Sequence, residues 1–185
     1  KQRGRQESGY LEAMPERFGD YSQTPFTTQA DKPVVWVHAV SLGETRAAAV
    51  LIDALRKRMP EVRILLTHGT ATGRAAGQAI LRDGDVQVWQ PWDTPAVVRG
   101  FLQHFQPDLG VLMETEVWPN WVAACARTQV PMVLVNARMS EKSMRQAQRL
   151  AWLSRPAFAG LHAVWAQTDA DAYRLRALGA SVQGV

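Results

Sequence analysis

The stretch that decides the fold runs from Pro33 to Arg58 and reads PVVWVHAVSLGETRAAAVLIDALRKR. Its first part, Val34–His38, is a short, mostly apolar run that is rich in β-branched valine, which is typical of a buried strand. A helical pattern follows over 44–58, where apolar side chains recur at intervals of three and four residues. A strand followed at once by a helix is the repeating unit of α/β proteins.

The same alternation continues to the end of the chain. Further strands are expected at 62–67, 86–89, 109–113, 132–136, 163–166 and 181–183. Further helices are expected at 71–82, 95–105, 119–128, 141–158 and 169–178. Strands that alternate with helices predict an α/β fold, a doubly wound parallel sheet with helices on both faces.

Length and composition predict one globular domain over residues 33–185. The chain has 185 residues, of which 46% are hydrophobic and 21% charged, and this is an ordinary globular balance. Residues 1–32 lack periodicity and are expected to be a lead-in segment. The single cysteine, Cys125, excludes an internal disulfide and fits a reducing compartment. No apolar run approaches the roughly 18 residues that a membrane span needs. Because the sequence begins at Lys1, we expect a fragment of a longer protein.

The charge balance restricts the partner only loosely. The formal net charge is +4, and a basic excess favours an acidic partner. A nucleic acid, an anionic membrane surface and a phosphorylated substrate all satisfy this requirement, so charge alone does not choose among them.

The motif Ser41-Leu-Gly-Glu44 has two interpretations. As a capping box, Ser41 would cap the helix, and Glu44 would reach back to the Ser41 amide. As a catalytic group, Glu44 would face a ligand crevice beyond the end of its strand. In an open doubly wound sheet, ligands bind at the switch point, which in the order 3-2-1-4-5 lies between the first and fourth strands.

The sequence Met113-Glu-Thr-Glu116 follows the fourth expected strand, so it would bring Glu114 and Glu116 to the same crevice as Glu44. Two carboxylates after a buried strand are costly unless they have a role. Their structural alternative is to favour the dipole of the helix that begins near Pro119.

Two further loops are expected at this edge. Thr67–Gly73 reads THGTATG, and its small residues and hydroxyls suit phosphate or sugar hydroxyl groups. It is neither a Walker A loop nor a dinucleotide fingerprint. Arg138 could clamp a phosphate or carboxylate, or be a solvated arginine at a helix entry. The four histidines have no metal-site spacing, so no metal site is predicted.

Three motifs, HAVSLGE (38–44), METEVWPN (113–120) and NARMSEKS (136–143), resemble in order and spacing the 3-deoxy-D-manno-octulosonic acid (Kdo) transferases of lipopolysaccharide synthesis. ERFGDY (16–21), WQPWDTP (89–95) and AQTDADAYRLRALGA (166–180) extend the resemblance over nearly the whole chain. It implies the Rossmann-like N-terminal, acceptor-binding half of a GT-B glycosyltransferase. A membrane anchor before residue 1 and a C-terminal nucleotide-sugar domain are expected outside this chain.

The resemblance also implies roles for individual residues. Glu44 would be the proton acceptor and Glu114 the transition-state stabiliser. The substrate-binding residues would be Ser41, Gly43, Thr70, Thr72, Gly73, Glu116, Asn136, Arg138 and Ser140. The loop THGTATG departs from the common family pattern Thr-Thr-Met-Thr-Pro-Thr-Gly at His68, Gly69 and Ala71.

The implied reaction moves Kdo from CMP-Kdo to the tetraacylated lipid A precursor at the cytoplasmic face of the inner membrane. It needs no cofactor beyond the donor substrate. The partners would be this glycolipid and the membrane surface, with no nucleic acid. The chain alone would be inactive. Two alternatives are the acceptor half of another GT-B transferase and a non-catalytic Rossmann-type binding module.

Overall fold

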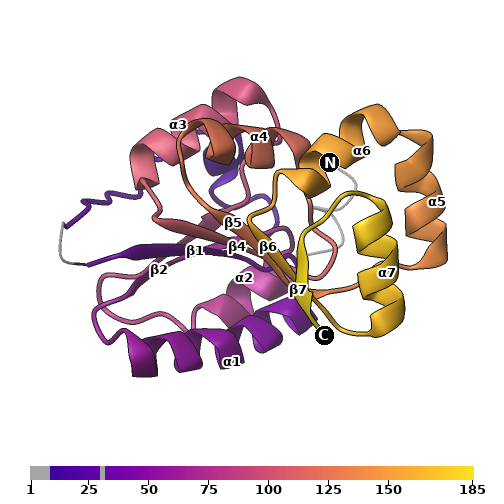
Figure 1. Ribbon diagram of the computed structural model, residues 1–185. Helices are drawn as coiled ribbons and strands as arrows, with labels where there is room; N and C mark the ends of the chain where they lie inside the picture. The colour runs from indigo at the N-terminus through magenta and orange to yellow at the C-terminus, as the bar shows by residue number, and fades with distance from the viewer. Residues whose placement is uncertain (1–8, 30–31) are drawn as a thin grey trace. The chain divides into compact units, whose positions relative to one another are not determined.

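The computed structural model describes residues 9–29 and 32–185, which form two compact units that divide after Asp108 (Figure 1). The first unit has three parallel strands in the order β3-β2-β1. Its elements are the 3-10 helix η2 (Met14–Phe18), β1 (Val34–His38), α1 (Leu42–Arg58), β2 (Arg63–His68), α2 (Ala71–Gly77), β3 (Val86–Trp89) and α3 (Pro95–Phe105).

The second unit has four parallel strands in the order β4-β5-β6-β7. Its elements are β4 (Leu109–Met113), α4 (Pro119–Arg127), β5 (Met132–Ala137), α5 (Glu141–Arg149), α6 (Ala151–Ala159), β6 (Ala163–Ala166), α7 (Asp169–Ala177) and β7 (Val182–Gly184). The strands of both units are parallel and alternate with helices, so the predicted α/β, Rossmann-like fold is confirmed. The single domain over 33–185 stays a prediction.

The strands of the first unit are buried on both faces. All five residues of β1 and the last five of β2 are buried, because α1 covers one face of these strands and α3 the other (Figure 1). Within this core, the rings of Trp36 and Phe101 lie 4.7 Å apart. The apolar run that predicted a strand is therefore the run that the helices cover.

Two predicted helices differ from the structure. The helix expected at 71–82 ends at Gly77, since Gly73 and Gly77 both lower helix propensity. The helix expected at 141–158 is two helices that meet at Leu150, whose φ and ψ of −111° and 37° are not helical. The hydroxyl of Ser154 donates to the carbonyl of Ala147 at 2.7 Å, which satisfies one of the acceptors that the end of α5 exposes.

No helix in the described part of the chain is long and apolar enough to cross a membrane. Cys125 lies inside α4 and is 1% exposed. Its burial raises the pKa of the thiol to about 12, which keeps Cys125 protonated at neutral pH.

Two histidines at the ends of β1 and β2 are buried in the neutral form. Burial, reinforced by the neighbouring His68, lowers the pKa of His38 to about 3. Burial also lowers the pKa of His68 to about 4. The Nδ1 atom of His38 lies 2.8 Å from the Thr67 hydroxyl oxygen, so this histidine is part of the packing at the strand end.

We predict that the first unit loses stability as the pH falls below about 6.5, the pKa of an unfolded histidine. Each of the two histidines then binds a proton in the unfolded state only. This lowers the free energy of unfolding by about 1.4 kcal/mol per pH unit for each histidine, until the pH reaches the pKa of the folded state. Urea unfolding at pH 7.5 and 5.5 measures this slope. The substitution His38→Gln should remove one histidine's share of it, whereas His162→Gln, at an exposed position, should leave it unchanged. Equal slopes for His38→Gln and the parent chain would contradict the prediction.

Candidate active site

The turn between β1 and α1 holds the carboxylate of Glu44 in a capping box. Ser41 is the N-cap residue, and its hydroxyl oxygen accepts from the Glu44 amide at 3.3 Å. The same hydroxyl donates to Glu44 Oε1 at 2.9 Å. The capping interpretation is thus confirmed, with one correction: Glu44 Oε2 accepts from the amide of Val40 at 2.9 Å, not from that of Ser41. The carboxylate is long enough to reach the residue before the cap.

Capping does not exclude a chemical role for Glu44. The two bonds occupy two of the roughly four lone-pair sites of a carboxylate. They also fix the side chain at the carboxyl end of β1, where its exposed fraction is 9%. A nearly buried carboxylate that accepts two hydrogen bonds has little rotamer freedom. A general base must be positioned in this way.

The β2–α2 loop is joined to the same turn through one carbonyl. The oxygen of Val40 accepts from the amides of Gly69 and Thr70 at 3.2 and 3.0 Å, and from the Thr70 hydroxyl at 2.9 Å. The approach is close, because a Cβ on Gly73 would lie 2.8 Å from the same oxygen. This contact requires glycine at position 73.

The other residues predicted in these loops differ in their surroundings. Thr70 caps α2 by accepting from the Gly73 amide at 3.1 Å, so its hydroxyl already has a structural task. Thr72 is exposed. Gly43 is exposed, and a Cβ there would have no neighbour closer than the Ser41 hydroxyl at 3.9 Å. Their substrate-binding roles, together with those of Ser41 and Gly73, stay predictions.

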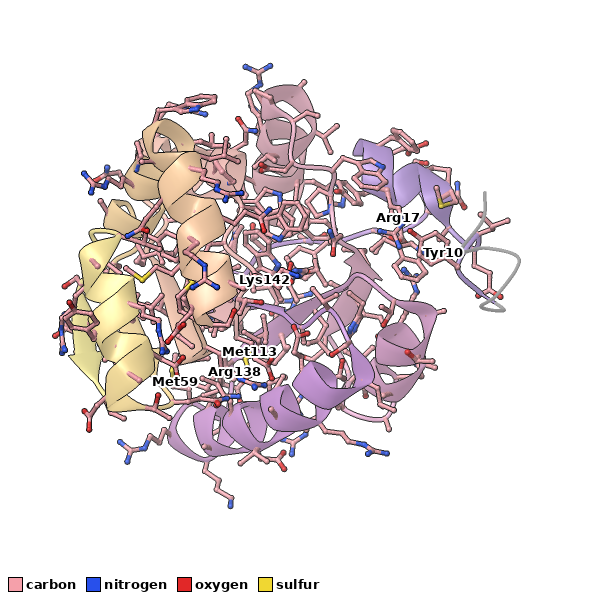
Figure 2. The ribbon with its side chains drawn as sticks, turned by 90° about the vertical axis from the view of Figure 1, so that its right-hand side faces the viewer. Tyr10, Arg17, Met59, Met113, Arg138 and Lys142 are labelled. Atoms are coloured by element: carbon pink, nitrogen blue, oxygen red, sulfur yellow. The ribbon has the colours of Figure 1, made fainter. Side chains whose placement is uncertain are left out.

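Sequence reasoning missed the contribution of the lead-in segment to this loop. The guanidinium of Arg17 donates to the carbonyl of Gly69 at 3.3 Å, and it lies 4.1 Å from the centre of the Trp89 ring and 4.8 Å from that of Tyr10 (Figure 2). Burial lowers the pKa of Arg17. Its neighbour Glu16 accepts from the Trp89 amide at 2.7 Å and pairs with Arg74 at 2.6 Å. An aperiodic segment with few apolar residues gives no sequence signal for such contacts.

The second unit has its own polar cluster at the carboxyl ends of β4 and β5. Glu114 and Asn136 both have left-handed backbones, with φ of +57° and +53°, and Glu114 N donates to the carbonyl of Val135 at 3.0 Å. Asparagine tolerates this conformation, whereas glutamate adopts it at a cost of roughly 1 kcal/mol or more. A strained residue of this kind is typical of functional sites.

A pocket of about 390 Å³ opens at these strand ends. Glu114, Arg138 and Ser140 line it, and the charged groups of Glu114 and Arg138 lie 4.0 Å apart. The Arg138 side chain is 59% exposed, so it keeps donors for an anionic group. The structure thus brings three predicted site residues together around one pocket.

The hydrogen-bond partners of Asn136 and Glu116, and of Ser140 in the pocket, lie within the protein. The side-chain oxygen of Asn136 accepts from Gln167 at 2.7 Å. Glu116 accepts from the indole of Trp118 at 3.1 Å. Ser140 caps α5 by accepting from the Ser143 amide at 3.1 Å. These contacts fix the positions of the three side chains but do not show that they bind a ligand. Their substrate-binding roles stay predictions.

Five residues that line the pocket were not predicted, namely Thr115, Ser143, Gln167, Thr168 and Asp171. Asp171, in the first turn of α7, accepts from the Met139 amide at 2.8 Å. Hydrogen bonds from Thr168 and Met139 and the cations of Arg174 and Arg138 outweigh partial burial and lower the pKa of Asp171. The capping pattern Thr168-x-x-Asp171 was a sequence signal for this carboxylate, but not for its contact with the Met139 loop.

Within residues 9–29 and 32–185, no three His, Cys, Asp or Glu side chains form a group that could hold a metal ion. The polar groups around both clusters are carboxylates, hydroxyls, amides and arginines. They suit a substrate with hydroxyl and anionic groups.

A family model described as 3-deoxy-D-manno-octulosonic-acid transferase (kdotransferase) matches residues 12–185. A 3-deoxy-D-manno-octulosonic acid transferase from Bordetella pertussis is 48% identical over 190 residues, which cover 99% of this chain and 43% of the relative. One from Rickettsia felis is 34% identical and covers 88% of this chain and 35% of the relative.

The chain belongs to the Kdo transferase family. It spans less than half the length of these relatives. Two solved structures share its fold: the S. aureus MnaA-UDP co-structure, with a TM-score of 0.56 at 15% identity over 81% of this chain, and a UDP-N-acetylglucosamine 2-epimerase, with a TM-score of 0.54 at 16% identity over 82%. At this identity the likeness shows the fold alone.

The structure places both motif glutamates beyond the carboxyl end of a strand, Glu44 after β1 and Glu114 after β4. That the two carboxylates share one crevice stays a prediction from the expected strand order.

We predict that glycine at position 114 relieves the backbone strain of Glu114. Glu114→Gly should be more stable than Glu114→Ala by about 1 kcal/mol, because only glycine adopts φ near +57° without penalty. Both variants lack the carboxylate, so the difference isolates the backbone. Chemical denaturation measures it.

A matched control is available at Gln129, which is exposed and has a φ of +59°. The Gly and Ala variants of Gln129 should differ by a similar amount. An alanine variant of Glu114 that is as stable as the glycine variant would contradict the strained backbone.

Proposed function

We propose that this chain is the acceptor-binding half of a GT-B glycosyltransferase that moves Kdo from CMP-Kdo to the tetraacylated lipid A precursor. The observation that carries the proposal is the family match across residues 12–185, which includes both motif glutamates. Because the relatives are more than twice as long, the donor nucleotide would be bound by the remainder of a full-length enzyme. The chain by itself would then be inactive.

Glu44 would act as the general base. Its two capping bonds hold the carboxylate at the end of β1, ready to take the proton from the acceptor hydroxyl. The hydroxyl oxygen then attacks the anomeric carbon of Kdo, and the bond from that carbon to the phosphate of CMP breaks. CMP leaves with the bonding electron pair, so the reaction is balanced without an oxidant, a reductant or a further cofactor.

Glu114 would stabilise the positive charge that develops on the sugar in the transition state. Its strained backbone supports this role, since the structure maintains an unfavourable conformation at the pocket edge. Arg138, 4.0 Å from Glu114, would bind an anionic group of a substrate. The hydroxyls of Ser140 and Thr72 would bind sugar hydroxyls.

The partners would be the lipid A precursor and the surface of the inner membrane, on its cytoplasmic face. The exposed basic residues of the second unit support this location, because anionic lipids attract such residues at about 1 kcal/mol each. No role for a nucleic acid is proposed.

In an enzyme with the full length of the relatives, we predict that Glu44→Gln lowers kcat at least a hundredfold. The neutral amide keeps the size and an acceptor oxygen for the cap, but it cannot take a proton, and general-base catalysis contributes typically 10²–10⁴. Radiolabelled Kdo transfer to the purified precursor measures the rate. Glu12→Gln, at an exposed position in the lead-in segment, should be fully active.

A loss of less than about tenfold, which corresponds to about 1.4 kcal/mol of barrier, would contradict the base role. Glycolipid binding that does not depend on Glu44 is the result that a non-catalytic binding module predicts. Thermal unfolding of both variants excludes a loss of activity through misfolding.

A further inference from the structure

An apolar groove of about 440 Å³ lies in the second unit beside the polar pocket. Trp118, Leu150, Leu153 and Phe158 contribute apolar side chains to it. Trp121, three residues after Trp118, is fully buried instead. The groove therefore takes one tryptophan of the pair, and the core takes the other.

The groove exists because α5 does not pack closely. None of the residues of α5 is buried, so polar contacts hold this helix. Arg174 donates to the carbonyl of Met139 at 3.1 Å and lies 3.7 Å from Glu141. At its other end, α5 is joined to α6 through the break at Leu150 (Figure 1). A helix fixed at both ends but without buried side chains leaves the apolar side chains of its neighbours accessible.

The groove and the polar pocket adjoin each other. Thr115 and Ser143 line both of them. Glu114 and Arg138 therefore lie at one end of a surface whose other end is apolar. A ligand that fills both parts must be an amphiphile, with a polar head on the Arg138 side and a hydrocarbon part along α5 and α6.

The charges of this region are mixed but net positive, because Glu114 and Asp171 line the pocket together with Arg138, whereas the neighbouring helices carry a basic excess. Residues 141–159 contain four basic side chains and one acidic one, namely Lys142, Arg145, Arg149, Arg155 and Glu141. All five are exposed, and Lys142 and Arg138 are labelled in Figure 2. Nearby cations attract a phosphate-bearing ligand over about one Debye length.

We propose that the groove binds a single acyl chain of an amphiphile whose anionic head occupies the pocket at Arg138. This inference rests on the proposed function, since it assigns an acyl chain of the phosphorylated glycolipid acceptor to the second unit. The groove is a site for an individual chain, distinct from the docking of a whole bilayer on exposed Trp152.

The experiment titrates the chain with lysophosphatidates of eight, ten and twelve acyl carbons below their micelle concentrations, by calorimetry. Each methylene that enters the groove should tighten binding about fourfold, from about 0.8 kcal/mol per buried methylene. Glycerol 3-phosphate, which has the head without the chain, should bind more weakly than all three. Affinity that is independent of chain length, or equal for glycerol 3-phosphate, would overturn the proposal.

A matched pair of substitutions locates the chain. Ala147 is half-buried and lines the groove, whereas Ala177 is exposed on α7 and lies outside it. Ala147→Phe should abolish the dependence on chain length, and Ala177→Phe should retain it. Leu153→Ala is a second variant, which opens the groove instead of filling it and should weaken the twelve-carbon probe about tenfold. Unchanged binding in Ala147→Phe and Leu153→Ala would overturn the proposal.

A bilayer arm separates the two lipid sources. Vesicles of phosphatidylglycerol and phosphatidylcholine test docking on a membrane. Binding to vesicles that needs Trp152 but no binding of monomeric lysophosphatidate would overturn the groove and assign this face to the bilayer. Monomer binding that is unchanged in Trp152→Ala supports the groove.

Failure of the groove and failure of the proposed function give different results. Lysophosphatidate binding requires neither CMP-Kdo nor transfer, so a full-length enzyme that transfers no Kdo would leave the groove intact. Conversely, an unchanged KM for the acylated acceptor in Ala147→Phe would contradict acyl-chain binding in the groove. The Kdo transfer measured in the same assay would still support the proposed function.

Discussion

The peptide groups on either side of Val40 connect the parts of the first unit that concern function. The amide of Val40 donates to Glu44, and its carbonyl accepts from Gly69 and Thr70. One residue thus fixes the glutamate at the start of α1 and joins it to the loop before α2. The close approach of Gly73 to the same carbonyl is possible only without a side chain. Because each of these groups restrains the next, the position of the Glu44 carboxylate is a property of two loops and not of one side chain.

The second unit repeats this arrangement with different residues. Thr168 caps α7 and bonds the carboxylate of Asp171, which reaches the amide of Met139 in a neighbouring loop. In both units, the acidic residue of a capping box accepts a hydrogen bond from a backbone amide outside the cap. This bond restrains the loop at the end of a strand. This use of a local motif supplies rigidity at the edge where α/β proteins bind ligands. Glu114 and Asn136 adopt left-handed backbones in the second unit, a conformation that asparagine tolerates and that costs glutamate roughly 1 kcal/mol or more.

Sequence reasoning predicted the elements well where a pattern is local. The runs at Val34–His38 and Leu109–Met113 are strands with those bounds, because a buried parallel strand is almost uniformly apolar. The break at Leu150 had no such local signal at its own position. Pro156 lies six residues later, inside α6, and Ser154 bonds the carbonyl of Ala147 across the interruption. The candidate residues could be named from motifs, but their partners could not. Glu44 bonds to Val40, Asn136 to Gln167 and Arg17 to Gly69 through contacts that depend on how the loops approach each other, and no spacing in the sequence encodes that approach.

The central claim is that this chain holds the acylated acceptor and that Arg138 binds its anionic group. Calorimetric titration of the chain with the tetraacylated lipid A precursor in detergent tests this directly, with Arg138→Ala beside the parent chain and Arg127→Ala as an exposed control on α4. The account predicts saturable binding that Arg138→Ala weakens at least tenfold, as expected for the loss of a charge-assisted hydrogen bond, and that Arg127→Ala leaves unchanged. An absence of saturable binding, or equal affinity in the parent and Arg138→Ala, would contradict it.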